Sequence, residues 1–144
     1  MAIKKQDFYE GAALYQLVRT NKVERIVYAQ PYFILNDRLA LLLKYSTSKD
    51  SPWNFVFSQA ELSELNNTDS HFDYYAALIC GSDGVVALTK WQVGTLIGET
   101  SAASRIGCYR KHDHHYLVKG PNGPLDRKIS RSNWMNILGE GADA

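Results

Sequence analysis

The stretch RLALLLKYSTSKDSPWNFVF, from Arg38 to Phe57, decides the fold. Its apolar run is unbroken from Leu39 to Leu43, so both faces of the expected strand are apolar, as is typical of a strand in the middle of a sheet. The run ends on Lys44, and hydroxyl side chains follow almost at once. Such a lysine suits a site that handles phosphate, and it equally suits an ordinary strand end whose amine reaches water.

The residues before this stretch predict a helix followed by extended chain. Apolar side chains recur at helical spacing over 6–20. Residues 23–29 and 31–35 are typical of extended chain. Asn36-Asp37 is a two-residue turn candidate, so we expect the segment 31–35 to form a hairpin with the strand that follows.

Two later segments share one pattern, in which a short apolar strand leads into a capping box. Ser58 with Glu61, and Thr89 with Gln92, have the required spacing of a hydroxyl and a Glu or Gln three residues later. The pattern predicts short helices over 58–66 and 89–98. Between them lie a predicted buried strand over 74–80, the turn Gly81-Ser82-Asp83-Gly84 and a strand over 85–88.

The last third predicts a β-hairpin and a helix. Residues 106–111 and 115–119 flank His112-Asp113-His114, and a final helix is expected over 133–138. The order of elements predicts one α/β (α+β) domain over 1–144, with a mixed central β-sheet flanked by helices. Within it we expect a core over about 7–98 and a basic C-terminal β-hairpin with its helix over about 104–138.

The composition is that of a soluble globular protein, with 45% hydrophobic and 22% charged residues. No window approaches the roughly 18 consecutive apolar residues that a membrane span requires, and the N-terminal residues lack the apolar run of a signal peptide. We therefore expect a cytoplasmic protein with no membrane partner.

Positive charge is concentrated at the C-terminal end. Residues 105–132 contain seven basic and only two acidic side chains. Aromatic residues such as Tyr109 and Tyr116 are interleaved with them, and basic side chains neutralise phosphates while aromatic rings stack on bases. The pattern predicts a nucleic-acid partner, although a solvated charged face remains an alternative. The predicted contacts are Arg105, Arg110, Lys111, Lys119, Arg127, Lys128 and Arg131.

A helix with an early glutamate, a hairpin, and a strand ending in lysine followed by hydroxyls resembles the core of the PD-(D/E)xK (restriction-endonuclease-like) nuclease superfamily. The matching residues are Glu10, Asn36-Asp37, Lys44 and Ser46. The resemblance implies a metal-dependent DNA endonuclease, with DNA rather than RNA as partner. It implies Mg²⁺ held by acidic side chains and a lysine acting at the phosphate. We therefore expect Glu10 and Asp37 to be catalytic and to hold Mg²⁺, with Lys44 catalytic and Ser46 a phosphate contact.

The chain departs from the family pattern at two positions. Leu42 stands two residues before Lys44, where the family has Asp or Glu, and the hairpin strand carries Tyr32 and its apolar neighbours instead of Asp. A hard cation needs oxygen ligands, so Leu42 cannot hold one. Two hypotheses remain: an endonuclease with a displaced acid set, and a catalytically inactive module that binds nucleic acid or protein on the same scaffold.

The remaining motifs leave other questions open. Consecutive hairpin residues point to opposite sides, so only two of the side chains in His112–His115 share a face, and metal binding by this loop is undecided. The chain has no Walker or G-x-G-x-x-G motif, so beyond Mg²⁺ no cofactor is expected. With nine tyrosines available as interface anchors, a homo-oligomer and a protein partner are also open.

Overall fold

The computed structural model describes residues 2–68, 71–98 and 102–143, with side chains as far as Gly139. Its first sheet has five strands in the order β1-β2-β3-β5-β6. All neighbours are antiparallel except β3 and β5, which are parallel and are joined through the second sheet and a helix. The bounds are β1 Ile26–Ala29, β2 Tyr32–Leu35, β3 Leu39–Ser46, β5 Asp73–Cys80 and β6 Gly84–Thr89.

A second sheet, in the order β4-β7-β8-β9, was not anticipated from the sequence. Its strands are β4 Trp53–Phe57, β7 Ser104–Tyr109, β8 Leu117–Gly120 and β9 Gly123–Pro124. The helices are α1 Lys5–Val18, α2 Gln59–Asn66, α3 Lys90–Ile97 and α4 Asn133–Asp143. The predicted mixed α+β class is confirmed, but β4 pairs with β7 and not with the central sheet.

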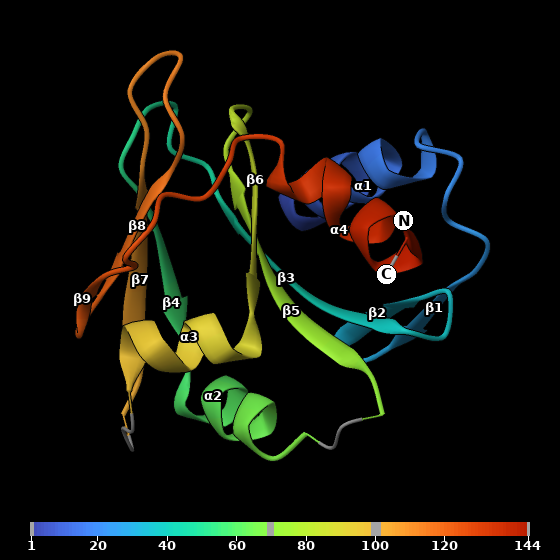
Figure 1. Cartoon of the computed structure of the whole chain (residues 1–144), viewed down its shortest axis with the longest axis horizontal. Coiled ribbons are helices and arrows are strands. Elements are labelled where there is room, and N and C mark those ends of the chain that lie inside the picture. Colours follow the sequence, from blue (N-terminus) through green and yellow to red (C-terminus); the bar gives the residue numbers. More distant parts are fainter. Residues whose placement is uncertain (1, 69–70, 99–101, 144) are drawn as a thin grey trace.

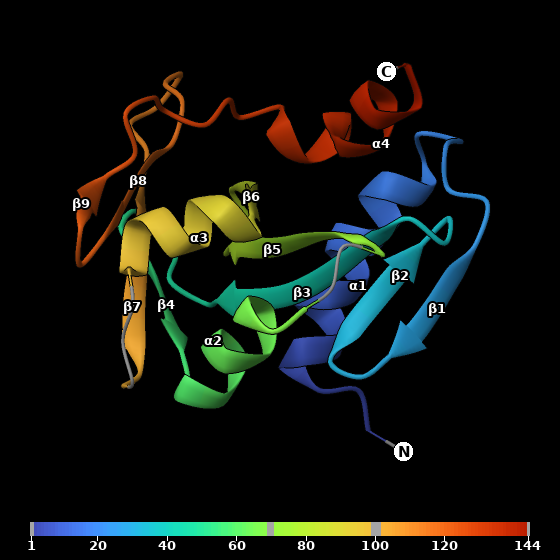
Figure 2. The same cartoon turned by 60° about the horizontal axis from the view of Figure 1, so that its bottom comes forward.

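The two faces of β3 are buried in two separate cores. Leu39, Leu41 and Leu43 pack with residues of α1 and α4, whereas Ala40 and Leu42 pack with the second sheet, α2 and α3. Figure 1 shows α1 and α4 together on one side of β3 and β5, with β4, β7 and β8 on the other. In Figure 2, α1 lies behind β3 and α2 in front of it. The central position predicted for this strand is therefore confirmed.

Both predicted capping boxes are present. The Ser58 hydroxyl accepts from the Glu61 amide at 3.1 Å, and the Ser58 amide donates to Glu61 Oε1 at 2.9 Å. The Thr89 hydroxyl accepts from the Gln92 amide at 3.1 Å, and the Thr89 amide donates to Gln92 Oε1 at 2.9 Å. These local bonds satisfy amide groups that a helix start leaves unpaired, which is why both helices begin where the sequence predicts.

The connection of β2 to β3 differs from the predicted two-residue turn. Leu35 pairs with Leu39, so three residues form the loop, and both Asn36 and Asp37 have positive φ, 54° and 53°. The Asn36 side-chain amide donates to the Lys22 carbonyl at 2.8 Å, and its oxygen accepts from two amides of the preceding segment. An asparagine tolerates this left-handed conformation because its short polar side chain bonds nearby backbone.

Among the described residues, no helix is long and apolar enough to cross a membrane.

Candidate functional site

The amine of Lys44 is bound by a carboxylate that comes from α2. Lys44 Nζ lies 2.8 Å from both Oε1 and Oε2 of Glu61, and 4.9 Å from the centre of the Phe57 ring. Only 16% of the Lys44 side chain and 30% of the Glu61 side chain are exposed. Glu61 is held in place because it is also the third residue of the α2 capping box. The strand-end lysine therefore does not simply reach water.

The pKa of Glu61 reflects competition between burial and hydrogen bonding. Burial raises the pKa of this carboxyl. The hydrogen bond from Lys44 and the one from the Ser58 amide outweigh it, together with the Lys44 charge, and hold the pKa below its ordinary value of 4.5. Glu61 is therefore ionised at neutral pH and forms a charge-assisted pair with Lys44.

The structure places Asp37 far from Lys44. Asp37 lies in the loop before β3, and Lys44 lies near the far end of that strand. Because a strand advances roughly 3.3 Å per residue, the two backbone positions are on the order of 20 Å apart. The Asp37 side chain is 66% exposed and forms an ion pair with Arg25 at 3.5 Å. Asp37 therefore cannot share a magnesium ion with a group beside Lys44.

Glu10 lies on the opposite face of the first sheet from Lys44. The α1 side of β3 is reached by Tyr45, whose ring stacks on Tyr9 at 5.1 Å between centroids, whereas Lys44 points to α2. Burial raises the pKa of Glu10, and its carboxylate accepts from Gln6 Nε2 at 2.8 Å. The structure does not bring Glu10, Asp37 and Lys44 together, so the expected magnesium site is not formed by this set.

Glu61 shares a cavity with other oxygen-bearing side chains. A cavity of about 150 Å³ is lined by Tyr32, Leu42, Glu61 and Glu64, among others. The Tyr32 hydroxyl is buried and has no hydrogen-bond partner among the described residues. Burial raises the pKa of Tyr32 to about 12, and the nearby Glu64 charge adds to the effect. Sequence reasoning assigned Glu61 only a capping role, since nothing in the local pattern shows that α2 lies against the end of β3.

Ser46, the predicted phosphate contact, forms hydrogen bonds with the loop after β3 and with the β5–β6 turn. Its hydroxyl accepts from the Ser48 amide at 3.4 Å, and its carbonyl accepts from the Gly81 amide at 3.0 Å. The Ser48 carbonyl in turn accepts from the Trp53 indole at 2.9 Å. These bonds tie the loop to the turn between β5 and β6 and to β4.

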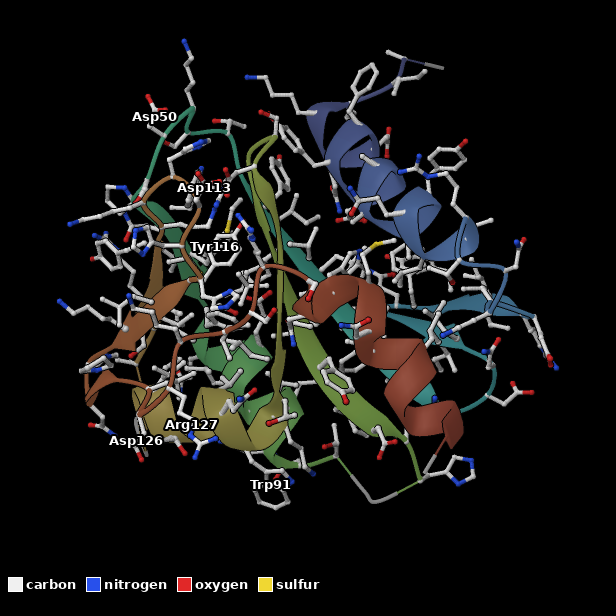
Figure 3. The ribbon with its side chains drawn as sticks, turned by 45° about the horizontal axis from the view of Figure 1, so that its top comes forward. Asp50, Trp91, Asp113, Tyr116, Asp126 and Arg127 are labelled. Atoms are coloured by element: carbon white, nitrogen blue, oxygen red, sulfur yellow. The ribbon has the colours of Figure 1, made fainter. Side chains whose placement is uncertain are left out.

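Arg110 is committed to an internal ion pair. Its Nε and Nη2 atoms donate to the two oxygens of Asp83 at 2.8 and 2.7 Å, and the Tyr116 hydroxyl donates to the same carboxylate. The side chains of Arg110 and Asp83 are 15% and 22% exposed. Figure 3 shows Tyr116 beside the turn that carries Asp83. Arg110 therefore links the two sheets and is not available as a phosphate contact.

The other six basic residues predicted to contact nucleic acid differ in whether a carboxylate lies beside them. Arg131 Nη1 lies 3.5 Å from Asp113 Oδ1. Over the described residues, no carboxylate lies within 4.0 Å of the side-chain nitrogens of the remaining five. These five are Arg105, Lys111, Lys119, Arg127 and Lys128.

Tyr109 is contacted by one of these five cations and shares a hollow with two others. Lys119 Nζ lies 5.4 Å from the centre of the Tyr109 ring. Lys111 and Lys128 line, with Tyr109, a hollow of about 330 Å³ to which His114 and His115 also contribute. Gly107 leaves room for the Tyr109 ring, because a Cβ there would stand 3.2 Å from it. We call this hollow, with Tyr109 and Lys119, the basic hollow.

The outward face of the second sheet continues from the basic hollow. Phe55 and Ile106 point into the core, so their strand neighbours Val56 and Arg105 point outward and lie opposite each other in β4 and β7. Arg105 and Val56 are exposed. Arg105 therefore adds a positive charge to the same side of the molecule as Lys119.

The histidine loop makes internal contacts. His112 Nε2 lies 3.3 Å from Asp113 Oδ2, and His115 Nδ1 accepts from the Arg131 amide at 3.2 Å. Among the described residues, no group of three or more His, Cys, Asp or Glu side chains is placed to hold a metal ion.

Comparison of the chain with protein-family models, curated proteins and solved structures found no match.

We expect acid to destabilise the protein through two carboxylates. The hydrogen bond from Arg110 holds the pKa of Asp83 below 3.8, against the opposing effect of burial, and the pKa of Glu61 is likewise depressed. A depressed pKa means that the stabilisation is complete above the ordinary values, 4.5 and 3.8, and is lost as pH falls through the lower folded-state values. Urea unfolding measured between pH 6 and pH 2 is expected to show this loss.

The matched variant for this measurement is Glu61→Gln, because glutamine keeps the capping box and removes the charge. Its unfolding free energy should vary less with pH than that of the wild type below about pH 4.5. Asp37→Asn, at an exposed loop carboxylate, is the control. Identical pH profiles for Glu61→Gln and the wild type would show that the Lys44 pair does not contribute.

Proposed function

We propose that this chain is a nucleic-acid-binding module whose contact surface is the basic hollow and the adjoining outward face of the second sheet. The observation that carries the proposal is that Lys111 and Lys128 share one hollow with Tyr109 and that Lys119 lies over the Tyr109 ring, while none of the three has a carboxylate partner among the described residues. Paired cations serve the fold, as Arg110 does, whereas unpaired cations are available to phosphates.

The composition of this surface suits a polyanion whose bases can stack on an aromatic side chain. The lysines supply counterion-releasing contacts to phosphates, and Tyr109 supplies an aromatic face that Lys119 contacts. A protein partner would more often be met by apolar anchors with few lysines, because lysine is depleted in protein interfaces. The charge of the hollow therefore favours nucleic acid over protein.

The direct test is a mobility shift with labelled oligonucleotides at about 50 mM salt, a condition under which phosphate contacts are strong. Duplex DNA, single-stranded DNA and RNA are compared at equal length. We expect the protein to retard DNA. If no nucleic acid is retarded at micromolar protein concentration, the proposed function is excluded.

A second candidate function is phosphodiester hydrolysis beside Lys44, favoured by the cavity that holds Glu61, Glu64 and the unpartnered Tyr32 hydroxyl. Carboxylates are the ligands that Mg²⁺ prefers, so Glu61 and Glu64 would hold the ion in place of Glu10 and Asp37. Mg²⁺ would supply Lewis-acid polarisation of a phosphate. The fit is partial, since both oxygens of Glu61 already accept from Lys44. Lys44 and Tyr32 would then orient the phosphate.

Hydrolysis is tested with plasmid and oligonucleotide substrates in the presence of Mg²⁺ or Mn²⁺. If the second candidate is right, cleavage is expected for the wild type and is lost in Lys44→Ala, which removes the amine bound to Glu61, and in Glu61→Gln, which removes a carboxylate of the cavity. Glu10→Gln and Asp37→Asn serve as controls and should cleave normally, since neither side chain reaches Lys44. Cleavage that survives Lys44→Ala would reject this site.

A further inference from the structure

Two adjoining hollows form a groove at the edge where β5 and α3 begin. The first, of about 330 Å³, is lined by Phe72, Tyr74, Lys90 and Trp91, among others. The second, of about 390 Å³, includes Arg38 and Lys128. Both hollows are lined by Asp73, Tyr75 and Thr89, so they lie next to each other. We call them together the aromatic groove.

Aromatic rings and an ammonium group alternate in the first hollow. Lys90 Nζ lies 5.0 Å from the Trp91 ring centre and 5.8 Å from that of Tyr74. It also donates to Thr68 Oγ1 at 3.1 Å. Phe72 packs edge-on against Tyr74 at 6.1 Å between centroids. The lysine is thus fixed between two rings by contacts that leave its charge uncompensated by a carboxylate within 4.0 Å among the described residues.

Trp91 is the most exposed large aromatic side chain among the described residues, at 76%. Figure 3 shows it projecting from α3 away from both sheets, on the same side of this view as Arg127. A tryptophan left in water presents a broad ring face, and base stacking on such rings is a recurrent way of binding single strands.

The electrostatics of the groove favour an anion. Its described lining contains three cations, Arg38, Lys90 and Lys128, and one carboxylate, Asp73. Asp73 is already paired with Arg38 at 3.5 Å. Lys128 belongs to both the aromatic groove and the basic hollow, so the two surfaces meet at this residue.

We propose that the aromatic groove binds an unpaired segment of a single nucleic-acid strand, with a base stacked on Trp91 and phosphates near Lys90 and Lys128. This inference rests on the proposed nucleic-acid binding and adds the class of ligand, a single strand. Bases in a duplex are stacked on one another and cannot lie on a protein ring, whereas single-stranded bases are free to do so. A peptide from a partner protein is the competing occupant, and the test below separates the two.

Trp91 provides its own probe. The chain has three tryptophans, and the other two, Trp53 and Trp134, are 3% and 2% exposed. Fluorescence accessible to iodide therefore reports Trp91. We expect a single-stranded 20-mer of deoxythymidine to quench the Trp91 fluorescence. The Trp91 emission that remains should be protected from quenching by iodide. A 20-mer of abasic sites has the same phosphates without bases, and it should bind more weakly and quench little.

The matched variants are Trp91→Ala, Trp91→Phe and Tyr15→Ala. Loss of one stacked base should weaken single-strand binding about 10-fold or more in Trp91→Ala, while Trp91→Phe keeps most of the affinity and duplex binding is unchanged. Tyr15 is also an exposed aromatic residue, at 60%, but lies on α1, so Tyr15→Ala should bind normally. Circular dichroism checks that each variant is folded.

Three results would overturn the inference, and the first two separate its failure from that of the proposed function. If duplex DNA binds but the single strand leaves Trp91 fluorescence and iodide access unchanged, the groove does not hold a base, and the proposed function stands without it. If no nucleic acid binds at all, both proposals fail. Equal single-strand affinity for Trp91→Ala and the wild type also contradicts stacking at this position.

Discussion

Replacing Lys111 and Lys119 together by glutamate is expected to weaken DNA binding severely and to flatten its dependence on salt. Lys119 lies over the Tyr109 ring and Lys111 lines the same hollow as Tyr109, and neither lysine has a carboxylate partner among the described residues. If each contacts one phosphate, the slope of log K against log salt should fall in magnitude by about 1.8. Fluorescence anisotropy between 50 and 200 mM salt measures this change.

The control for this variant carries the same charge change on the other side of the first sheet. Lys5 and Arg19 lie at the two ends of α1, and α1 packs against the face of the first sheet opposite the second sheet. Lys5→Glu with Arg19→Glu should therefore retain nearly all of the affinity and the slope. A loss of equal size in both double variants would mean that binding follows net charge alone, and no defined basic hollow would then be needed.

Replacing Asp83 by alanine is expected to lower the free energy of unfolding by about 2 kcal/mol. The carboxylate accepts two hydrogen bonds from Arg110 and one from Tyr116, and the substitution leaves a mostly buried guanidinium and a buried hydroxyl without their acceptor. It also removes the link between the β5–β6 turn and the chain after β7. Urea denaturation monitored by circular dichroism gives the difference.

Two comparisons show whether the loss comes from this cluster. Asp50→Ala removes an exposed loop carboxylate and should change stability by no more than about 0.5 kcal/mol. Tyr116→Phe removes one donor and keeps the ring, so about 1 kcal/mol is expected. A loss for Asp83→Ala no greater than that for Asp50→Ala would contradict the role assigned to the ion pair.

The features that the sequence predicted correctly rest on local or periodic patterns. The unbroken run Leu39–Leu43 predicts a strand buried on both faces, and β3 is buried on both faces. The two capping boxes are complete within four residues, so their hydrogen bonds do not depend on the rest of the chain. Such patterns predict where helices and strands lie and which of their faces are buried.

The features that the sequence did not predict depend on long-range packing. The pairing of β4 with β7 joins Phe57 to Ser104, and no local pattern specifies that partner. The expected set of Glu10, Asp37 and Lys44 failed to assemble because alternation along β3 turns Lys44 away from α1. Glu61 reaches Lys44 only because α2 returns to the end of β3.

The basic residues of 105–132 also show that long-range packing cannot be predicted from the local sequence. Its charge is visible in the sequence, yet which cations are available is decided by contacts with distant acids. Arg110 meets Asp83 across 27 positions of chain, whereas Lys111, its neighbour, has no such acid among the described residues. The aromatic groove likewise joins Trp91 of α3 to Lys128 of the last third of the chain.

The measurement that tests nucleic-acid binding most directly is the affinity of the wild-type protein for a DNA oligonucleotide across 50 to 200 mM salt. A module that uses three to five phosphate contacts should give a linear plot of log K against log salt with a slope between about −2 and −5. A slope near zero, or no measurable binding at the lowest salt, would contradict the role assigned to the basic hollow.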